Sequence, residues 1–344
     1  MRSQSISAVA VGLGVALLAT TAATPSARAA CSKLDCGSNS PYLSEFAFHE
    51  LNFDGEPNHE GLVVAGLESP LVWWTQLYPH VEAYRLTAVD SHGQEWLHGA
   101  ALVGSKIMIV TSEPEPRKFE LSIDAVYTGF DLWVDPAGEY LESYKLGWVK
   151  AGVAMDHRPL CTLPPPQLIG DGQEWYPDPD GTILYTGDRY DAASKTVIAH
   201  DLEKTAGWVN VVCPGGAGYK LFETRHTLVT SNLTHDASAD EDQAMLKMYV
   251  SDVCGTGDSY TKQGTPLHWQ NQPGWGYLSG NEPVTEAWWD RDGAICLNVH
   301  RLGATYQQEL AERCPLPSCD ELDIKAATRW PEKDWVVSRL PDKP

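Results

Sequence analysis

Eight cysteines place the strongest restriction on what this chain can fold into. An even number of cysteines in an oxidising compartment favours disulfide bonds, so the chain can form up to four. No CxxC pair occurs, so the tight spacing that binds zinc is missing, and we predict neither a metal nor a cofactor. The cysteines that we assign to disulfides are Cys31, Cys36, Cys161, Cys213, Cys254, Cys296, Cys314 and Cys319.

Spacing alone leaves the pairing of these cysteines open. Cys213 and Cys254 flank a candidate helical segment and could close over it. Cys161 precedes a stretch rich in Pro and Gly and could tie two halves of the chain together. The first two and the last two cysteines each form a CxxxxC pair, which could bond locally or reach across the fold. An even set in a secreted chain leaves no cysteine over for catalysis.

The N-terminus has the pattern of a secretory signal peptide. Arg2 precedes an apolar run over residues 6–18, and Ala27-Arg28-Ala29 provides a small-x-small cleavage site. A membrane-spanning helix needs about 20 apolar residues, so we expect cleavage after Ala29 and no membrane span in the mature chain. Lipid attachment at Cys31 is the alternative, although an Arg stands three residues before it where lipoprotein signals usually carry Leu. The predicted location is therefore secreted or periplasmic.

The charge of the chain excludes one class of partner. The formal net charge is −21 at pH 7, and removal of residues 1–29 would take away two arginines and no acidic residue. A surface this acidic repels phosphate backbones, so we predict no nucleic-acid partner.

The first half of the mature chain, residues 30–163, has the alternation of β-strands. Phe119, Leu121 and Ile123 alternate with polar residues, which is typical of a half-buried strand. Asp90-Ser-His-Gly93 has turn composition between two strand-like segments, residues 84–89 and 95–103. We predict a β-sandwich or barrel-like N-terminal lobe.

The second half mixes both kinds of element. Residues 164–173 are rich in Pro and Gly and form the predicted linker, followed by an α+β lobe over 174–325 and a tail over 326–344. The clearest helix lies near residues 238–253, because Ser238 and Glu241 form a capping box and Gly255 follows as a stop signal. The predicted fold class is thus α+β and mostly β.

Four segments of the second half carry a family resemblance. They are Thr186–Ala192, Ala217–Leu221, Gln243–Met248 and Val250–Gly255. The chain resembles the ADYC domain-containing proteins, secreted bacterial proteins known mainly from myxobacteria, most specifically over residues 181–256. Ser251-Asp-Val-Cys254 stands where that family has Ala-Asp-Tyr-Cys. The resemblance implies that residues 174–325 form an ADYC-like domain of an exported protein, and it implies no activity.

The catalytic candidates lie in the segment Gly187-Asp-Arg-Tyr-Asp191. Asp188 and Asp191 flank Arg189, and two carboxylates around a guanidinium could position a polar substrate or act as acid and base. The competing interpretation is a structural Arg–Asp clamp that holds a turn. His226 is a candidate general base, although a histidine without a motif is more often structural.

A calcium site is a further alternative that the sequence does not favour. Asp178-Pro-Asp-Gly181 resembles the start of a calcium loop. Arg189 stands at the twelfth position, where such a loop requires Glu. We therefore interpret the segment as an acidic turn.

Thirteen tryptophans include two adjacent pairs, Trp73-Trp74 and Trp288-Trp289. Neighbouring residues of a strand point to opposite faces, so one member of each pair could be exposed and bind a ligand. Core filling is the alternative for most of them. The predicted function is a non-enzymatic extracellular or envelope binding module, with a glycan or another exported protein as its partner. A hydrolase that acts on an extracellular polymer through carboxylates is the second hypothesis.

Overall fold

The computed structural model describes residues 41–82, 84–134, 140–153, 157–161, 167–168, 174–175, 181–191, 195–201, 203–224, 238–262, 265, 267–271, 284–321 and 335–340. The protein is mostly β, with 43% strand and 16% helix, and this confirms the predicted fold class. The predicted signal peptide, Cys31, Cys36 and His226 lie outside the described residues.

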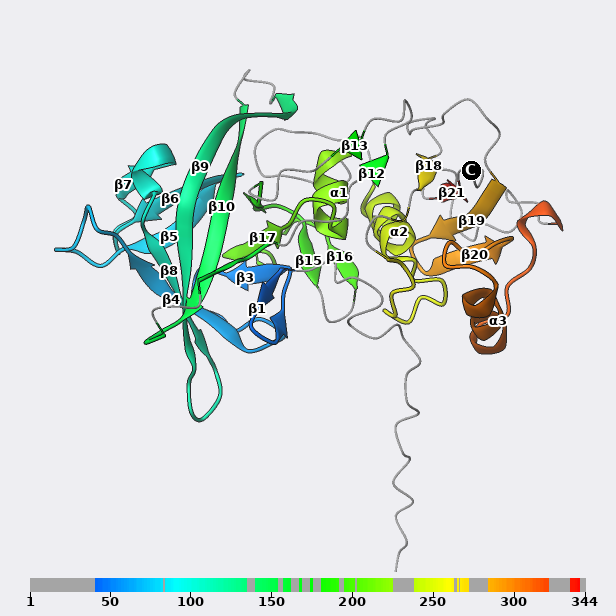
Figure 1. Cartoon of the computed structure of the whole chain (residues 1–344), viewed down its shortest axis with the longest axis horizontal. Helices are drawn as coiled ribbons and strands as arrows, with labels where there is room; N and C mark the ends of the chain where they lie inside the picture. The colour runs from blue at the N-terminus through cyan, green and yellow to red at the C-terminus, as the bar shows by residue number, and fades with distance from the viewer. Residues whose placement is uncertain are drawn as a thin grey trace, which may run out of the picture.

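The largest element is an antiparallel sheet of five strands (Figure 1). Its hydrogen-bonded order is β11-β10-β9-β8-β4, and alternate residues such as Ile107, Ile109, Phe119, Leu121 and Ile123 turn inward to a common core. The opposite face carries polar side chains, as period-two alternation predicts. The strands are β4 (Leu62–Glu68), β8 (Lys106–Thr111), β9 (Lys118–Val134), β10 (Tyr140–Lys150) and β11 (Arg158–Pro159).

A three-stranded sheet contributes side chains to the same core as the five-stranded sheet. The order is β5-β6-β7, and the turn at residues 90–93 connects β6 to β7 as predicted. The segment after Glu95 differs from the prediction, because the strand ends at His98 and a 3-10 turn, η1 (Gly99–Leu102), follows. The strands are β5 (Tyr78–Glu82), β6 (Arg85–Val89) and β7 (Glu95–His98).

Short strands in the middle of the molecule connect the two halves of the sequence. β17 pairs with β14 on one side and with β3, from the start of the described chain, on the other. Backbone pairing of Tyr144 with Thr182 joins β10 to the same region. The predicted division at residues 164–173 stays a prediction. The short strands are β1 (Tyr42–Leu43), β2 (Phe46–Ala47), β3 (Glu50–Asn52), β12 (Gln167–Leu168), β13 (Glu174–Trp175), β14 (Ile183–Tyr185), β15 (Arg189–Asp191), β16 (Thr196–Ile198) and β17 (Trp208–Val212).

Helix α2 (Ala239–Val250) forms the centre of the C-terminal half. The Glu241 amide donates to the Ser238 hydroxyl at 3.1 Å, so the predicted N-terminal cap is present. The helix ends at Val250 because Ser251 adopts a left-handed conformation (φ 54°), four residues before the predicted stop at Gly255. The helix is therefore shorter than the predicted segment 238–253.

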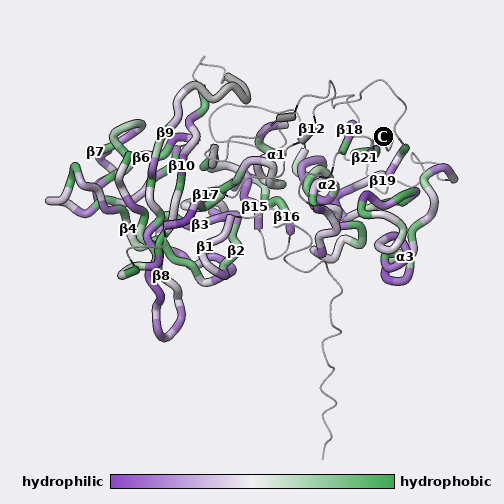
Figure 2. The backbone as a smooth tube through the Cα atoms, viewed as in Figure 1, coloured by the Kyte–Doolittle hydropathy of each residue, from purple (hydrophilic) through white to green (hydrophobic). Residues whose placement is uncertain are grey.

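An antiparallel sheet and two further helices surround α2 (Figure 1). The sheet has the order β18-β21-β19-β20, and its side chains share one core with α2. Figure 2 shows that the β8–β9 hairpin tip and helix α3 are mainly hydrophilic. The elements are α1 (Ala217–Glu223), β18 (His268–Asn271), β19 (Val284–Asp290), β20 (Gly293–Leu297), α3 (Ala304–Arg313), the 3-10 helix η2 (Cys319–Glu321) and β21 (Val336–Leu340).

Three disulfides connect the described cysteines, none of which is free: Cys161–Cys213, Cys254–Cys314 and Cys296–Cys319. The suggested bond between Cys213 and Cys254 is wrong, because each has another partner. The last CxxxxC pair reaches across the fold rather than closing locally. Cys161 does bond to a cysteine beyond the predicted linker. These bonds indicate an oxidising compartment.

Among the described residues, none of the helices combines the length and the apolar composition that crossing a bilayer requires.

Candidate functional site

Three tryptophan side chains gather on the surface beside the three-stranded sheet. Trp73 is 82% exposed, Trp74 is 59% exposed and Trp96 is 38% exposed. The ring centroids of Trp73 and Trp74 lie 5.9 Å apart with planes at 83°, and those of Trp74 and Trp96 lie 6.3 Å apart at 76°. Edge-to-face contacts between such exposed rings leave ring faces open to a ligand. We call these three residues the tryptophan platform.

The platform lies within a wider apolar surface. Five of the seven exposed large hydrophobic residues in the described part of the chain fall between residues 71 and 103. Besides the platform they include Leu71 and Val103. A Cβ added at Gly104 would lie 3.6 Å from Pro70 Cγ, so the two segments run close together. Exposed apolar clusters of this kind mark interaction surfaces.

The loop that carries Trp73 and Trp74 connects β4 to β5 and is anchored at several points. The side chain of Val72 is buried between its exposed neighbours. Leu77 is fully buried, and its carbonyl accepts a hydrogen bond of 2.8 Å from the amide of Leu67. Because these apolar residues turn inward, Trp73 and Trp74 turn outward.

Strand β7 and its turn hold the third ring. The indole Nε1 of Trp96 donates to Asp90 Oδ2 at 3.1 Å. Asp90 Oδ1 also accepts from the backbone amides of His92 and Gln94. The Trp96 hydrogen bond and these turn contacts lower the pKa of Asp90, so its carboxylate stays charged and fixes the ring.

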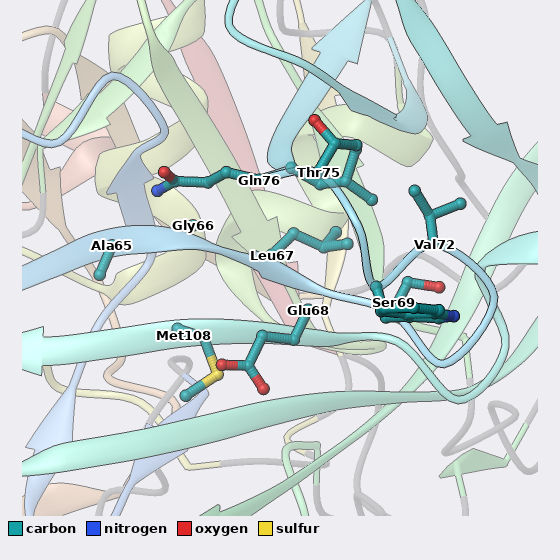
Figure 3. A pocket seen from close by; sticks show the side chains of 11 residues that line it. Ala65, Gly66, Leu67, Glu68, Ser69, Val72, Thr75, Gln76 and Met108 are labelled. Atoms are coloured by element: carbon teal, nitrogen blue, oxygen red, sulfur yellow. The ribbon is translucent and has the colours of Figure 1, made fainter.

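A hollow of about 480 Å³ adjoins the platform (Figure 3). Trp73 forms part of its wall together with Glu68, Ser69, Thr75 and Gln76. These polar side chains can donate and accept hydrogen bonds beside the aromatic surface. The described lining holds one acidic residue, Glu68, and no basic one, so the hollow disfavours anionic ligands.

The second tryptophan pair has different surroundings. Trp289 is fully buried, and its Nε1 donates to Ser338 Oγ at 2.8 Å. Trp288 lies on the other face of β19, half-buried, with its ring centroid 4.5 Å from that of Trp335. The alternation along the strand is as expected, but neither ring is presented to solvent as the platform rings are. A ligand-binding role for this pair stays a prediction.

The catalytic candidates lie on β15, in a hairpin with β16, and at its entrance. Arg189 donates to both oxygens of Glu50, at 2.5 and 2.9 Å, and its guanidinium lies 3.4 Å from the Trp208 ring centroid. Asp188 is buried and accepts from the His200 amide at 2.7 Å, whereas Asp191 is half-buried. The guanidinium is therefore clamped by Glu50, a residue distant in sequence. The catalytic role of these residues stays a prediction.

Burial controls the ionisation of the groups around this clamp. It raises the pKa of Glu50 even though Arg189 opposes the shift, and it lowers the pKa of His49 well below its ordinary value. The His49 ring packs 4.6 Å from that of Tyr190, whose side chain is also buried. The Glu50 carboxylate of the clamp is consequently part of a packed interior, whereas the Arg189 side chain is partly exposed.

The segment Ser251–Cys254, which carries the family signature, also lies at a structural junction. Asp252 is fully buried and accepts a hydrogen bond of 2.6 Å from the Lys247 ammonium and one of 2.9 Å from the Gly257 amide. Cys254 bonds to Cys314. These contacts tie the end of α2 to the loop that follows it and to the end of α3.

In the part of the chain that the structure describes, no group of three or more His, Cys, Asp and Glu residues gathers as a metal site. Most of the acidic turn at residues 178–181 lies outside the described residues, so the calcium alternative is untested.

Sequence reasoning missed Trp96 as a member of the platform. A signal was present, because Leu97 is the apolar core residue of β7 and its neighbour must point to the opposite face. What the sequence lacked was the packing of the β4–β5 loop against this hairpin.

Fold and site define a class: a disulfide-bonded, mostly β protein with an exposed aromatic surface. The ADYC domain model matches residues 99–303, more than half of the chain. The chain therefore belongs to the ADYC domain family, and the resemblance is confirmed. The platform residues precede the matched segment. No match was found among curated proteins or among solved structures.

Proposed function

We propose that this chain is an exported, non-enzymatic binding module whose tryptophan platform stacks against the rings of an uncharged glycan. The observation that carries the proposal is the exposure of Trp73, Trp74 and Trp96 beside a polar hollow. An exposed tryptophan ring lacks the stabilisation that burial normally gives this residue. A bound partner that covers the rings is the simplest reason for their position.

The polar lining favours a sugar over a purely apolar ligand. A sugar ring presents C–H groups to an aromatic face and hydroxyl groups around its rim. Ser69, Thr75 and Gln76 border the hollow and can hydrogen-bond those hydroxyls while the tryptophan rings contact the C–H groups.

The charges favour a glycan without acidic groups. Glu68 lines the hollow, and Asp90 holds Trp96 as a charged carboxylate. The whole chain is also strongly acidic. These negative charges would repel an anionic polymer but not a neutral one.

Export is part of the same proposal. The disulfides fit an oxidising compartment, and the predicted signal peptide over residues 1–29 would direct the chain there. Sugar polymers of an envelope or its surroundings are then the accessible ligands.

The hydrolase hypothesis receives less support. It needs Asp188, Asp191 and a histidine at a cleft, but Asp188 is buried against the His200 amide and Arg189 is bound by Glu50. His226 lies outside the described residues. Carboxylates held in this way are suited to supporting a hairpin.

The test is a binding screen of the oxidised mature protein against neutral and acidic polysaccharides, with product analysis in the same samples. We expect neutral polymers to bind without cleavage. Trp73→Ala and Trp74→Ala should each weaken binding about tenfold, because stacked aromatic contacts contribute about 0.5–1.5 kcal/mol beyond their buried area.

Val284→Ala is the matched control, because Val284 is a similarly exposed apolar residue far from the platform in sequence and on another sheet. Released oligosaccharides would replace the proposal with the hydrolase hypothesis. Binding that the Val284 variant weakens as much as the Trp73 variant would also contradict it. Concentration-dependent dimers that Trp73→Ala abolishes would assign the surface to self-association instead.

A further inference from the structure

Three polar side chains meet on the outer face of the five-stranded sheet. Ser122 and Asp124 lie two residues apart on β9, and His157 immediately precedes β11. Ser122 Oγ donates to Asp124 Oδ1 at 2.8 Å, and His157 Nε2 lies 3.0 Å from Ser122 Oγ and 3.2 Å from Asp124 Oδ2. We call these residues the sheet-face cluster.

A glycine on the strand between them makes this meeting possible. Gly147 of β10 pairs with Ser122 on one side and with Pro159 of β11 on the other. A Cβ at position 147 would collide with the His157 ring and lie 2.8 Å from Asp124 Oδ2. The missing side chain therefore leaves a recess in the sheet surface, and the imidazole nitrogen occupies it.

The geometry does not fit a serine nucleophile with a histidine base. A catalytic histidine uses one ring nitrogen for the serine and the other for the carboxylate. Here the same nitrogen, Nε2, faces both Ser122 and Asp124. A proton on Nε2 would serve the carboxylate, so this nitrogen could not also accept the serine proton.

An imidazole nitrogen, a hydroxyl oxygen and a carboxylate this close to one another can instead share a cation. We propose that Ser122, Asp124 and His157 bind a single divalent transition-metal ion of the zinc type. Zinc bound by nitrogen and oxygen at about 2.0–2.2 Å in a tetrahedron places neighbouring donors about 3.3 Å apart. The donor atoms of the sheet-face cluster are already 2.8–3.2 Å apart.

The surroundings leave the remaining position to water. A hollow of about 450 Å³ opens beside the cluster, lined by Ser122 and His157 among others. Lys106 and Lys150 also lie at its wall, and Lys106 is paired with Glu120 at 2.6 Å. His157 and Asp124 are partly exposed, which gives an ion access from solvent.

The experiment is zinc titration of the full oxidised mature protein by calorimetry, with metal content measured after equilibrium dialysis. We expect one saturable site. His157→Ala and Asp124→Asn should each weaken it by at least about tenfold, the scale on which a metal site loses affinity when one of its supporting partners is removed.

Gly147→Ala provides a test that removes no donor atom. Its added methyl group should displace His157 from Asp124 and weaken zinc binding as the donor substitutions do. His98→Ala is the matched control, because His98 pairs with Glu95 at 2.8 Å on the surface. Equal zinc binding by the native and His157→Ala proteins, or the absence of a saturable site, would overturn the proposal. So would loss of binding in the His98 variant alone.

Discussion

Trp73 and Trp74 stand in a loop at the surface, whereas Trp288 and Trp289 lie within β19, which is paired on both sides. The loop turns both rings of the first pair outward. The strand sends Trp289 into the core and leaves Trp288 half-buried against Trp335. The same dipeptide therefore provides a surface in one region and packing in the other, because the backbone decides which face each residue meets.

The two regions also differ in their polar contacts. Trp289 belongs to a buried network in which its indole and the Glu286 carboxylate both meet Ser338, while Arg301 donates to Glu286. The Trp73 ring contacts the neighbouring Trp74 ring. Loss of a ring should thus be costly for stability in one region and affect only binding in the other.

The largest effect should come from Trp289→Ala. Removing a fully buried tryptophan leaves a cavity and takes away the indole that donates to Ser338, and large-to-small changes of this kind cost about 3–5 kcal/mol. The free energy of unfolding, measured by denaturant titration of the oxidised protein, checks this value. A loss below about 1 kcal/mol would show that the two pairs do not differ as described.

A smaller but still large effect is expected for Glu286→Gln. The change leaves the buried Arg301 guanidinium without its charged partner, which should cost about 3 kcal/mol. Burial opposes ionisation of Glu286, but Arg301, Ser338 and His300 outweigh it and lower its pKa.

The sign of the pH dependence follows from that lowered pKa. A carboxyl group whose pKa is lower in the folded state stabilises the protein above its unfolded value and loses this contribution as the pH falls through the folded value. The native protein should therefore lose stability below about pH 4.5, and Glu286→Gln should lose less over the same range. Unfolding titrations at several pH values check this. Parallel curves for the two proteins would contradict it.

The smallest effect on stability should come from the double variant Trp73→Ala/Trp74→Ala. Exposed side chains away from special features usually change the free energy of unfolding by within about 0.5 kcal/mol. The same denaturant titration as for Trp289→Ala provides a direct comparison. A loss similar to that of the Trp289 variant would mean that the platform is part of the folded core and not a binding surface.

Much of the fold could be predicted from local sequence patterns. The turn at residues 90–93 and the alternation around Phe119 depend on neighbours in sequence, and so does the cap at Ser238. The mostly β class follows from such signals. The early end of α2 could not be predicted from the sequence, because the left-handed conformation of Ser251 accompanies the burial of Asp252 against Lys247.

Only part of the candidate site could be predicted from the sequence. The sequence identified Trp73 and Trp74 but could not distinguish them from Trp288 and Trp289, since exposure depends on which strands pair. Glu50 as partner of Arg189 is 139 residues away, and no spacing rule reaches that far. The disulfide pairing could not be predicted either, because the sheets bring together segments that are distant in sequence.

The bond between Cys161 and Cys213 has a consequence for survival among proteases. It closes a ring of chain that includes residues 162–212. A single cut anywhere inside that ring would leave the two fragments covalently joined. Such a nicked molecule would migrate as one band on a gel without reductant and as two bands with it.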